Sequence, residues 1–164
     1  MRAVIITVST SVAAGENEDR SGEALAELAT KAGVEVVAQE VVSDDRAQIE
    51  EALKRYSSPE HDITFIFTTG GTGLTPDDVT PEATSAVIDR DAPGIAEAMR
   101  AESLKHTPMG IISRGVSGIA GRTLIVNFPG NPKAIQQLFG LIAPVMKHAD
   151  ATLNRERGAS TPGH

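Results

Sequence analysis

A glycine-rich turn directly after an apolar run carries the clearest chemical signal in this sequence. The turn reads Thr69-Gly70-Gly71-Thr72-Gly73 and follows residues 63–68. Glycine lets the backbone adopt positive φ and approach an anion closely, so N–H groups and the two threonine hydroxyls can surround a phosphate. The turn lacks both the lysine of a Walker A loop and the G-x-G-x-x-G spacing. It predicts a phosphate-binding loop, with a plain strand-to-helix turn as the alternative.

Aspartates follow two of the expected strands. Asp78 comes shortly after the glycine turn, and Asp44 follows residues 34–42. Carboxylates beside a phosphate repel it unless a cation lies between them, so Asp44 and Asp78 are candidate Mg²⁺ ligands. The structural alternative is that Pro76-Asp77-Asp78 is simply a turn. If the two strands are neighbours, Asp44 and Asp78 face one cleft.

Further candidate ligands lie in three other segments. Asn127-Phe128-Pro129-Gly130-Asn131-Pro132-Lys133 offers a second anion site at a strand end, with Lys133 in the first turn of the next helix. Ser113-Arg114-Gly115 closes another expected strand, and its guanidinium suits a bidentate contact with phosphate or carboxylate, or a surface ion pair. Glu97 is either a ligand or a solvated acid on a helix.

The elements that position these residues alternate between strands and helices. Short β-branched apolar runs separated by helical patterns are typical of an α/β fold with a mostly parallel sheet covered on both faces. Strands are expected at residues 3–8, 34–42, 63–68, 109–112 and 123–127. Ligands of open parallel sheets bind beyond the carboxyl ends of the strands, where both glycine turns and both aspartates lie.

Helix boundaries follow from capping residues. The expected N-caps are Ser21, Asp45, Thr80 and Asn131. Another helix is expected to start at Pro93, and the last one to run over about residues 132–148 with a bend at Pro144. Residues 1–150 are expected to form one domain, and residues 151–164 a disordered tail.

Composition excludes several classes of function. The 164-residue chain is 40% hydrophobic, enough to bury a core, and has no cysteine for disulfides or thiolate sites. Its net charge of −7, without a run of Lys and Arg, argues against nucleic acid as a partner. The sequence has neither a signal-peptide pattern nor a membrane-spanning run, so a soluble, cytoplasmic protein is expected.

The ordered motifs resemble the MogA/MoaB family of molybdenum cofactor biosynthesis, which includes the G domain of gephyrin. The resemblance covers about residues 3–148. The matching segments are Thr68-Thr69-Gly70-Gly71-Thr72-Gly73, Asp78-Val79-Thr80-Pro81-Glu82-Ala83-Thr84, Pro93-Gly94-Ile95-Ala96-Glu97-Ala98-Met99-Arg100, Ser113-Arg114 and Asn127-Phe128-Pro129-Gly130-Asn131-Pro132.

This resemblance implies a three-layer αβα molybdopterin-binding domain that usually forms a homotrimer. In MogA-type members the activity is molybdopterin adenylyltransferase, which transfers AMP from ATP to the terminal phosphate of molybdopterin, requires Mg²⁺ and releases pyrophosphate. The product then passes to a separate molybdate-insertion protein. By resemblance, Asp44 and Asp78 are the catalytic and metal-binding aspartates. The expected substrate-binding residues are Thr69, Gly70, Gly71, Thr72, Gly73, Glu97, Ser113, Arg114, Asn127, Pro129, Gly130, Asn131 and Lys133.

A non-catalytic MoaB-type molybdopterin-binding protein is the alternative. Some MoaB proteins lack the acid-Val-Thr-Pro segment, whereas this chain keeps Asp78-Val79-Thr80-Pro81. Retention of that segment favours the catalytic reading.

Overall fold

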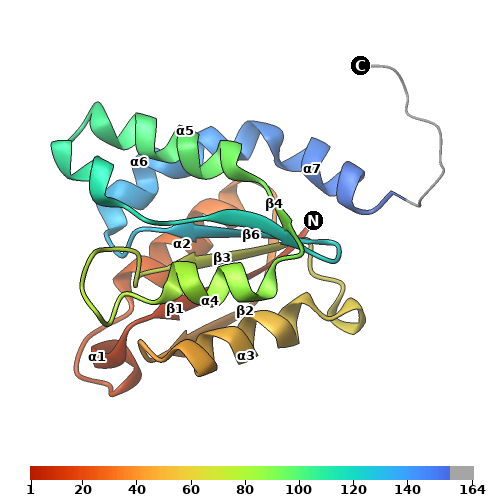
Figure 1. Cartoon of the computed structure of the whole chain (residues 1–164). Coiled ribbons are helices and arrows are strands. Elements are labelled where there is room, and N and C mark those ends of the chain that lie inside the picture. Colours follow the sequence, from red (N-terminus) through yellow and green to blue (C-terminus); the bar gives the residue numbers. More distant parts are fainter. Residues whose placement is uncertain (156–164) are drawn as a thin grey trace.

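A six-stranded sheet with the order β2-β1-β3-β6-β5-β4 forms the centre of the protein, in a computed structural model that describes residues 1–155 (Figure 1). Four neighbouring strands run parallel: β2 (Glu35–Val42), β1 (Arg2–Val8), β3 (Phe65–Thr69) and β6 (Thr123–Phe128). The short β5 (Ser117–Ala120) is antiparallel to β6, and β4 (Arg90–Asp91) is antiparallel to β5. The expected α/β fold with a mostly parallel sheet is confirmed.

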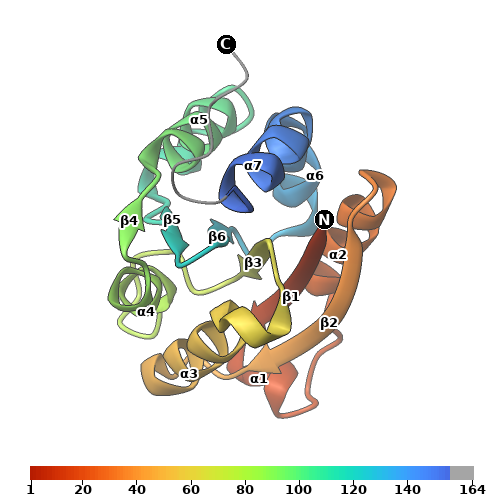
Figure 2. The same ribbon diagram turned by 90° about the vertical axis from the view of Figure 1, so that its right-hand side faces the viewer.

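Helices cover both faces of the sheet and complete three layers (Figure 2). One layer contains α2 (Arg20–Lys31), α5 (Pro93–Leu104), α6 (Pro132–Ile142) and α7 (Met146–Leu153). The other contains α3 (Arg46–Ser57) and α4 (Thr80–Val87). Each layer closes its own apolar core: Phe67 and Phe139 meet edge to face on the first side, and Ile49 packs with Ile66 on the second. Within residues 1–155, no helix combines the length and apolarity needed to cross a membrane.

Two of the expected N-caps are confirmed. Asp45 accepts a hydrogen bond from the Gln48 amide at 2.9 Å, and Asn131 accepts one from the Lys133 amide at 2.9 Å. The amides of the first turn of a helix have no hydrogen-bond acceptor within the helix. The side-chain oxygens of Asp45 and Asn131 supply one.

The other two N-caps are wrong. Helix α2 is capped by Asp19 and not Ser21, because Asp19 accepts from the Gly22 amide while its second oxygen accepts from the Thr7 hydroxyl at 2.7 Å. Thr80 does not cap α4, since its hydroxyl donates to the Gly70 carbonyl at 2.9 Å. Tertiary hydrogen bonds thus fix the side chains of Asp19 and Thr80, and α4 begins without a side-chain cap.

The strand expected at residues 109–112 is wrong. This apolar run lies in a 3-10 helix, η2 (Pro108–Ile112), capped by Thr107. Gly110 packs against Ser103 of α5 so tightly that a Cβ atom would stand 2.9 Å from the Ser103 carbonyl carbon. A four-residue apolar run has no period that separates strand from helix, so packing against α5 settles its conformation. Ser113-Arg114-Gly115 consequently follows a helix, and the actual strands here, β5 and β4, escaped the sequence pattern.

The final helix divides where Pro144 lies. Helix α6 ends at Ile142, the 3-10 turn η3 (Ala143–Val145) contains Pro144, and α7 continues to Leu153. Proline lacks the N–H that would continue the α-helical ladder. Because α7 reaches Leu153, residues 151–153 of the expected tail are helical. Residues 156–164 lie outside the described part of the chain. The remaining short elements are α1 (Thr10–Ala13) and η1 (Pro59–His61).

The four parallel strands end at one edge of the sheet. Thr7 pairs with Thr69, Thr69 with Phe128, and Val8 with Val42. Strand β1 lies between β2 and β3, so the two strands that precede Asp44 and Asp78 are not neighbours. The helices that follow these aspartates, α3 and α4, nevertheless pack side by side (Figures 1 and 2). Both aspartates thus remain at the carboxyl edge.

Candidate active site

The glycine turn after β3 has a backbone that only glycine adopts readily. Gly70 and Gly71 have φ values of +98° and +63°. A Cβ atom on Gly70 would collide with the Val8 carbonyl oxygen, and one on Gly71 with the Thr80 hydroxyl. The turn therefore needs glycine for its positive φ and for its close passage over β1.

The two glycine turns, after β3 and β6, pack against each other. The Gly70 amide donates to the Phe128 carbonyl at 3.2 Å, and the Thr69 hydroxyl donates to the Pro129 carbonyl at 2.9 Å. A Cβ atom on Gly130 would stand 3.3 Å from Gly70 Cα. Thr69 is completely buried, so its hydroxyl supports the second turn instead of facing a ligand. The structure thereby joins both predicted anion sites into one surface.

Asp78 is held at the base of the loop that follows the glycine turn. Its Oδ2 accepts hydrogen bonds from the Thr75 amide at 2.9 Å and the Thr75 hydroxyl at 2.7 Å. Partial burial by itself would raise the pKa of Asp78, but the donors of Thr75, the Gly73 amide and the positive charge of Arg114 together lower it. Asp78 is therefore a carboxylate at neutral pH. Thr75 was not predicted from the sequence. The segment Thr75-Pro76-Asp77-Asp78 is nevertheless typical of a turn, because it contains a proline followed by aspartates.

Asp44 stabilises the segment after β1. Its Oδ2 accepts from the Thr10 amide at 2.8 Å and the Thr10 hydroxyl at 2.9 Å, and the Asp44 amide donates back to that hydroxyl at 3.1 Å. Thr10 is the first residue of α1, whose N-cap is Ser9. This reciprocal contact orients Asp44 toward the carboxyl edge of β1, and Thr10 is a second residue that the sequence did not single out.

The two aspartates do not form a preformed metal cage. In the described residues 1–155, no cluster of three or more His, Cys, Asp and Glu side chains could hold a metal ion. Mg²⁺ in phosphoryl-transfer enzymes uses one or two carboxylates and completes its shell with water and substrate phosphates. Asp78 lies next to Gly73, and Asp44 is fixed by Thr10 at the same edge of the sheet, so both carboxylates suit a site in which the substrate supplies the remaining ligands.

Arg114 contacts the glycine loop and not an open surface. Its Nε donates to the Gly73 carbonyl at 2.7 Å, its Nη2 donates to the Asp78 carbonyl, and its Nη1 is paired with Glu82. The sequence predicted that Arg114 makes a bidentate contact with a phosphate or a carboxylate. In the structure, the carboxylate of Glu82 is this partner. As a direct substrate ligand, Arg114 remains a prediction.

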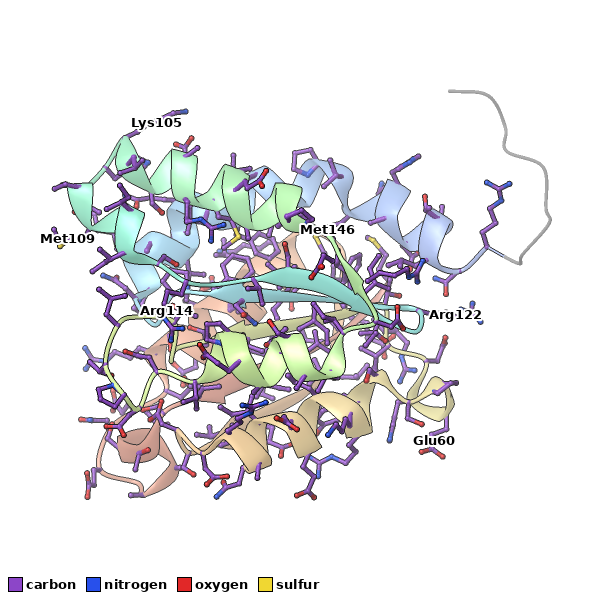
Figure 3. The ribbon with its side chains drawn as sticks, in the orientation of Figure 1. Glu60, Lys105, Met109, Arg114, Arg122 and Met146 are labelled. Carbon is purple, nitrogen blue, oxygen red and sulfur yellow. The ribbon has the colours of Figure 1, made fainter. Side chains whose placement is uncertain are left out.

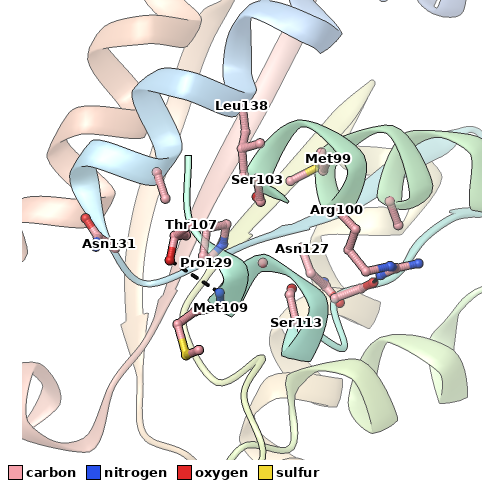
Figure 4. A pocket seen from close by; sticks show the side chains of 14 residues that line it. Met99, Arg100, Ser103, Thr107, Met109, Ser113, Asn127, Pro129, Asn131 and Leu138 are labelled. Carbon is pink, nitrogen blue, oxygen red and sulfur yellow. Dashed lines mark hydrogen bonds between the residues drawn. The ribbon is translucent and has the colours of Figure 1, made fainter. Parts of the chain in front are cut away.

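A cavity of about 180 Å³ lies between α5, η2 and the start of α6 (Figure 4). Four of the expected substrate residues line it: Ser113, Asn127, Pro129 and Asn131. Sequence reasoning missed its other polar residues, which are Arg100, Ser103 and Thr107. Arg100 and Ser103 lie on α5, and Thr107 lies in the turn before η2. The sequence hint for this part of the cavity is that the family motif Pro93–Arg100 forms the first part of α5.

Asn127 forms part of the frame of this cavity. Its Nδ2 donates to the hydroxyls of Thr68 and Thr84 at 2.9 and 3.0 Å, and its Oδ1 accepts from the Val116 amide at 3.1 Å. The side chain is buried and joins β3, β6, α4 and the segment before β5. Its amide group is therefore occupied by the protein.

A second cavity, of about 390 Å³, lies over the ends of β1, β3 and β6. Gly70 and Gly130 form one wall. The segment of residues 9–21 contributes the polar residues Ser9, Ser11, Asn17, Glu18, Arg20 and Ser21. These residues were missed, although Ser9 follows directly on β1 at the same carboxyl edge. Both cavities border the turn formed by residues 129–132.

Neither cavity is lined by Asp44, Asp78 or the glycine-turn residues Thr69, Gly71, Thr72 and Gly73. The same holds for Glu97 and Lys133. Both residues are exposed, and neither lines one of the two hollows. The backbone amide of Lys133 donates to the Asn131 side chain, which caps α6. Their assignment as substrate-binding residues stays a prediction without geometric support.

Comparison with known proteins identifies the family. Residues 4–148 match the family model described as "Probable molybdopterin binding domain". The chain belongs to this family. The family resemblance predicted from the ordered motifs is confirmed by this match.

Relatives cover the chain almost completely. A protein named molybdopterin adenylyltransferase from Helicobacter pylori is 36% identical over 88% of this chain and 82% of its own length. The crystal structure of the molybdopterin biosynthesis enzyme MoaB from Thermus thermophilus has a TM-score of 0.86 and 42% identity, with 93% of this chain and 95% of that chain covered. The molybdenum cofactor synthesis protein cinnamon of Drosophila melanogaster is 35% identical over 97% of this chain, which spans only 28% of the length of that protein.

Proposed function

We propose that this protein is a molybdopterin adenylyltransferase, which transfers AMP from ATP to the terminal phosphate of molybdopterin. The observation that carries the proposal is the joining of the two glycine turns, by the contact of Gly70 with Gly130, at the edge that also holds Asp44 and Asp78. The Helicobacter pylori relative with this name supports the reaction. Two cavities that share one turn suit a reaction with two substrates.

In this reaction, an oxygen of the pterin phosphate attacks the α-phosphorus of ATP. The bond from that phosphorus to the oxygen bridging the β-phosphate breaks, and pyrophosphate leaves. Such a transfer needs alignment and charge neutralisation, and little covalent help from the protein. The backbone amides of Gly71 and Thr72 bind phosphate, whereas those of Gly70 and Gly73 donate to Phe128 and Asp78. The cavity lined by Ser113 and Asn131 receives the pterin.

We also propose that Asp44 and Asp78 hold Mg²⁺ together with substrate phosphates. The bound ion supplies the positive charge that neutralises the triphosphate, a task for which the glycine turn has no lysine of its own. The residues of the chain orient both carboxylates: Thr10 fixes Asp44, and Thr75 fixes Asp78.

The decisive experiment incubates the protein with molybdopterin, ATP and Mg²⁺ and measures pyrophosphate. Pyrophosphate release is expected, and Asp78→Asn should lower kcat by about 100-fold or more because one phosphate-facing charge is lost. The matched control is Asp62→Asn, a change at an exposed aspartate after η1, at the opposite edge of the sheet. Tight binding of both substrates without pyrophosphate would overturn the proposal and favour the non-catalytic MoaB-type function.

The assembly and the fate of the product complete the proposal. We propose a cytoplasmic homotrimer that hands its product to a molybdate-insertion protein. Met109 and Ile111 are 60% and 70% exposed on η2, and contacts between copies of a chain commonly bury such residues. Sedimentation equilibrium tests the trimer, and a monomer at micromolar concentration would contradict it.

A further inference from the structure

The loop that carries Asp78 is closed at its base by a residue from a distant part of the chain. Within the loop, Thr75 and Asp78 bond to each other, and the Thr80 amide donates to the Gly71 carbonyl at 3.1 Å. These bonds join residues within the loop. A link from the base of the loop to a distant segment of the chain comes from Arg114, which is 41 residues beyond Gly73.

Arg114 contacts both arms of the loop. On the arm that leaves the glycine turn, its backbone amide donates to the Thr72 carbonyl at 2.9 Å and its Nε donates to the Gly73 carbonyl at 2.7 Å. On the arm that returns to α4, its Nη2 donates to the Asp78 carbonyl. The planar guanidinium presents its donors in a fixed fork, so it holds these carbonyls in one geometry.

Glu82 holds the guanidinium in place. It lies in the first turn of α4 and pairs with Arg114 Nη1. The hydrogen bond from Arg114 outweighs partial burial and lowers the pKa of Glu82, and the charge of Arg46 acts in the same direction. The carboxylate therefore stays ionised at neutral pH. The two side chains are 35% and 42% exposed, so water still reaches the pair and its strength comes from geometry.

We propose that Arg114 and Glu82 are positioning residues that clamp the loop of residues 70–80, and with it Asp78, for catalysis, without touching either substrate. This inference rests on the proposed adenylyl transfer. Neither side chain lines the cavity of about 180 Å³ or the cavity of about 390 Å³. The Nε, Nη1 and Nη2 atoms of Arg114 all donate to the loop or to Glu82, so a phosphate that took the fork of the guanidinium would have to replace these partners.

A clamp and a direct phosphate ligand differ in what Glu82 does. If Arg114 bound phosphate, Glu82→Gln would release the guanidinium and leave transfer unchanged or faster. If the pair is a clamp, Glu82→Gln and Arg114→Gln weaken the same contact, and the double variant is no worse than the poorer single one. Arg114→Lys distinguishes the two further, because lysine keeps the charge but lacks the fork.

The kinetic experiment measures pyrophosphate release for these variants. Both single variants should lower kcat by about 10- to 100-fold with KM for ATP changed less than about threefold, because misplaced groups slow the chemical step. Arg114→Lys should not restore kcat. Glu60→Gln is the matched control, since this exposed acid lies at the far end of the molecule from Arg114 (Figure 3). Thermal unfolding of each variant verifies that the fold is retained.

Hydrogen exchange tests the clamp independently of catalysis. The amides of Thr75, Asp78 and Thr80 should exchange at least about 10-fold faster in Glu82→Gln and Arg114→Gln, while those of β1 stay protected. Unchanged exchange together with unchanged kcat in Glu82→Gln overturns the clamp. If the wild-type protein releases no pyrophosphate, the proposed function fails, and exchange in this loop still decides whether the clamp exists.

Discussion

Gly130 lies against Gly70 so closely that a Cβ atom on Gly130 would stand 3.3 Å from Gly70 Cα. The two glycines belong to turns that follow β3 and β6, which are neighbours in the sheet. Each turn alone is an ordinary strand-to-helix connection. Their contact makes one continuous backbone surface, on which we place the phosphates.

Gly130→Ala should therefore disturb both turns at once. We expect a loss of about 1–3 kcal/mol in the free energy of unfolding, the usual cost of overpacking, together with slower pyrophosphate release. Urea unfolding and the transfer assay measure the two effects. Gly140→Ala in α6 is the control, because its Cβ meets no atom within 4 Å and should stabilise the helix by about 0.5–1 kcal/mol. Equal behaviour of the two variants would contradict the proposed contact.

The lowered pKa of Asp78 should appear in the pH dependence of stability. Its hydrogen bonds from Thr75 favour the ionised form in the folded state. The unfolded chain therefore binds the proton more readily, so the stabilisation is complete above the ordinary aspartate pKa of about 3.9 and is lost as the pH falls through the lower folded value.

Urea unfolding of wild type and Asp78→Asn measures this effect. The difference between their free energies of unfolding should shrink as the pH falls below about 4. Asp62→Asn controls for the general acid sensitivity of the fold. A difference that stays constant down to about pH 2.5 would show that Asp78 titrates at its unfolded value.

Asn127→Ala should act mainly on stability. The change removes the partner of the Val116 amide and of the Thr68 and Thr84 hydroxyls inside the protein. We expect a loss of about 2–4 kcal/mol, because buried polar groups that lose a partner keep their desolvation cost. Chemical unfolding gives the value, and Asn154→Ala on the exposed end of α7 is the comparison. Full stability with lost transfer would instead make Asn127 a direct ligand.

The sequence located the long strands of the sheet better than the short ones. The runs that became β1, β2, β3 and β6 were found because they are long, apolar and β-branched. Strands β4 and β5 have two and four residues and were missed, since so short a strand is defined by its partner and not by its own pattern. The opposite error occurred at residues 109–112, where an apolar run without a strand partner folded into η2.

The sequence by itself determined the family, the α/β class and the places of the two glycine turns, because glycine, proline and aspartate have local conformational effects that do not depend on distant contacts. Only the tertiary structure decided what each polar side chain does. Sheet order and register turn Thr69 toward Pro129 and Asn127 toward Thr68, and the path after η2 brings Arg114 to Gly73 and Asp78. The physical reason is that a hydrogen bond depends on where a partner far along the chain comes to lie, and chain folding alone sets that distance.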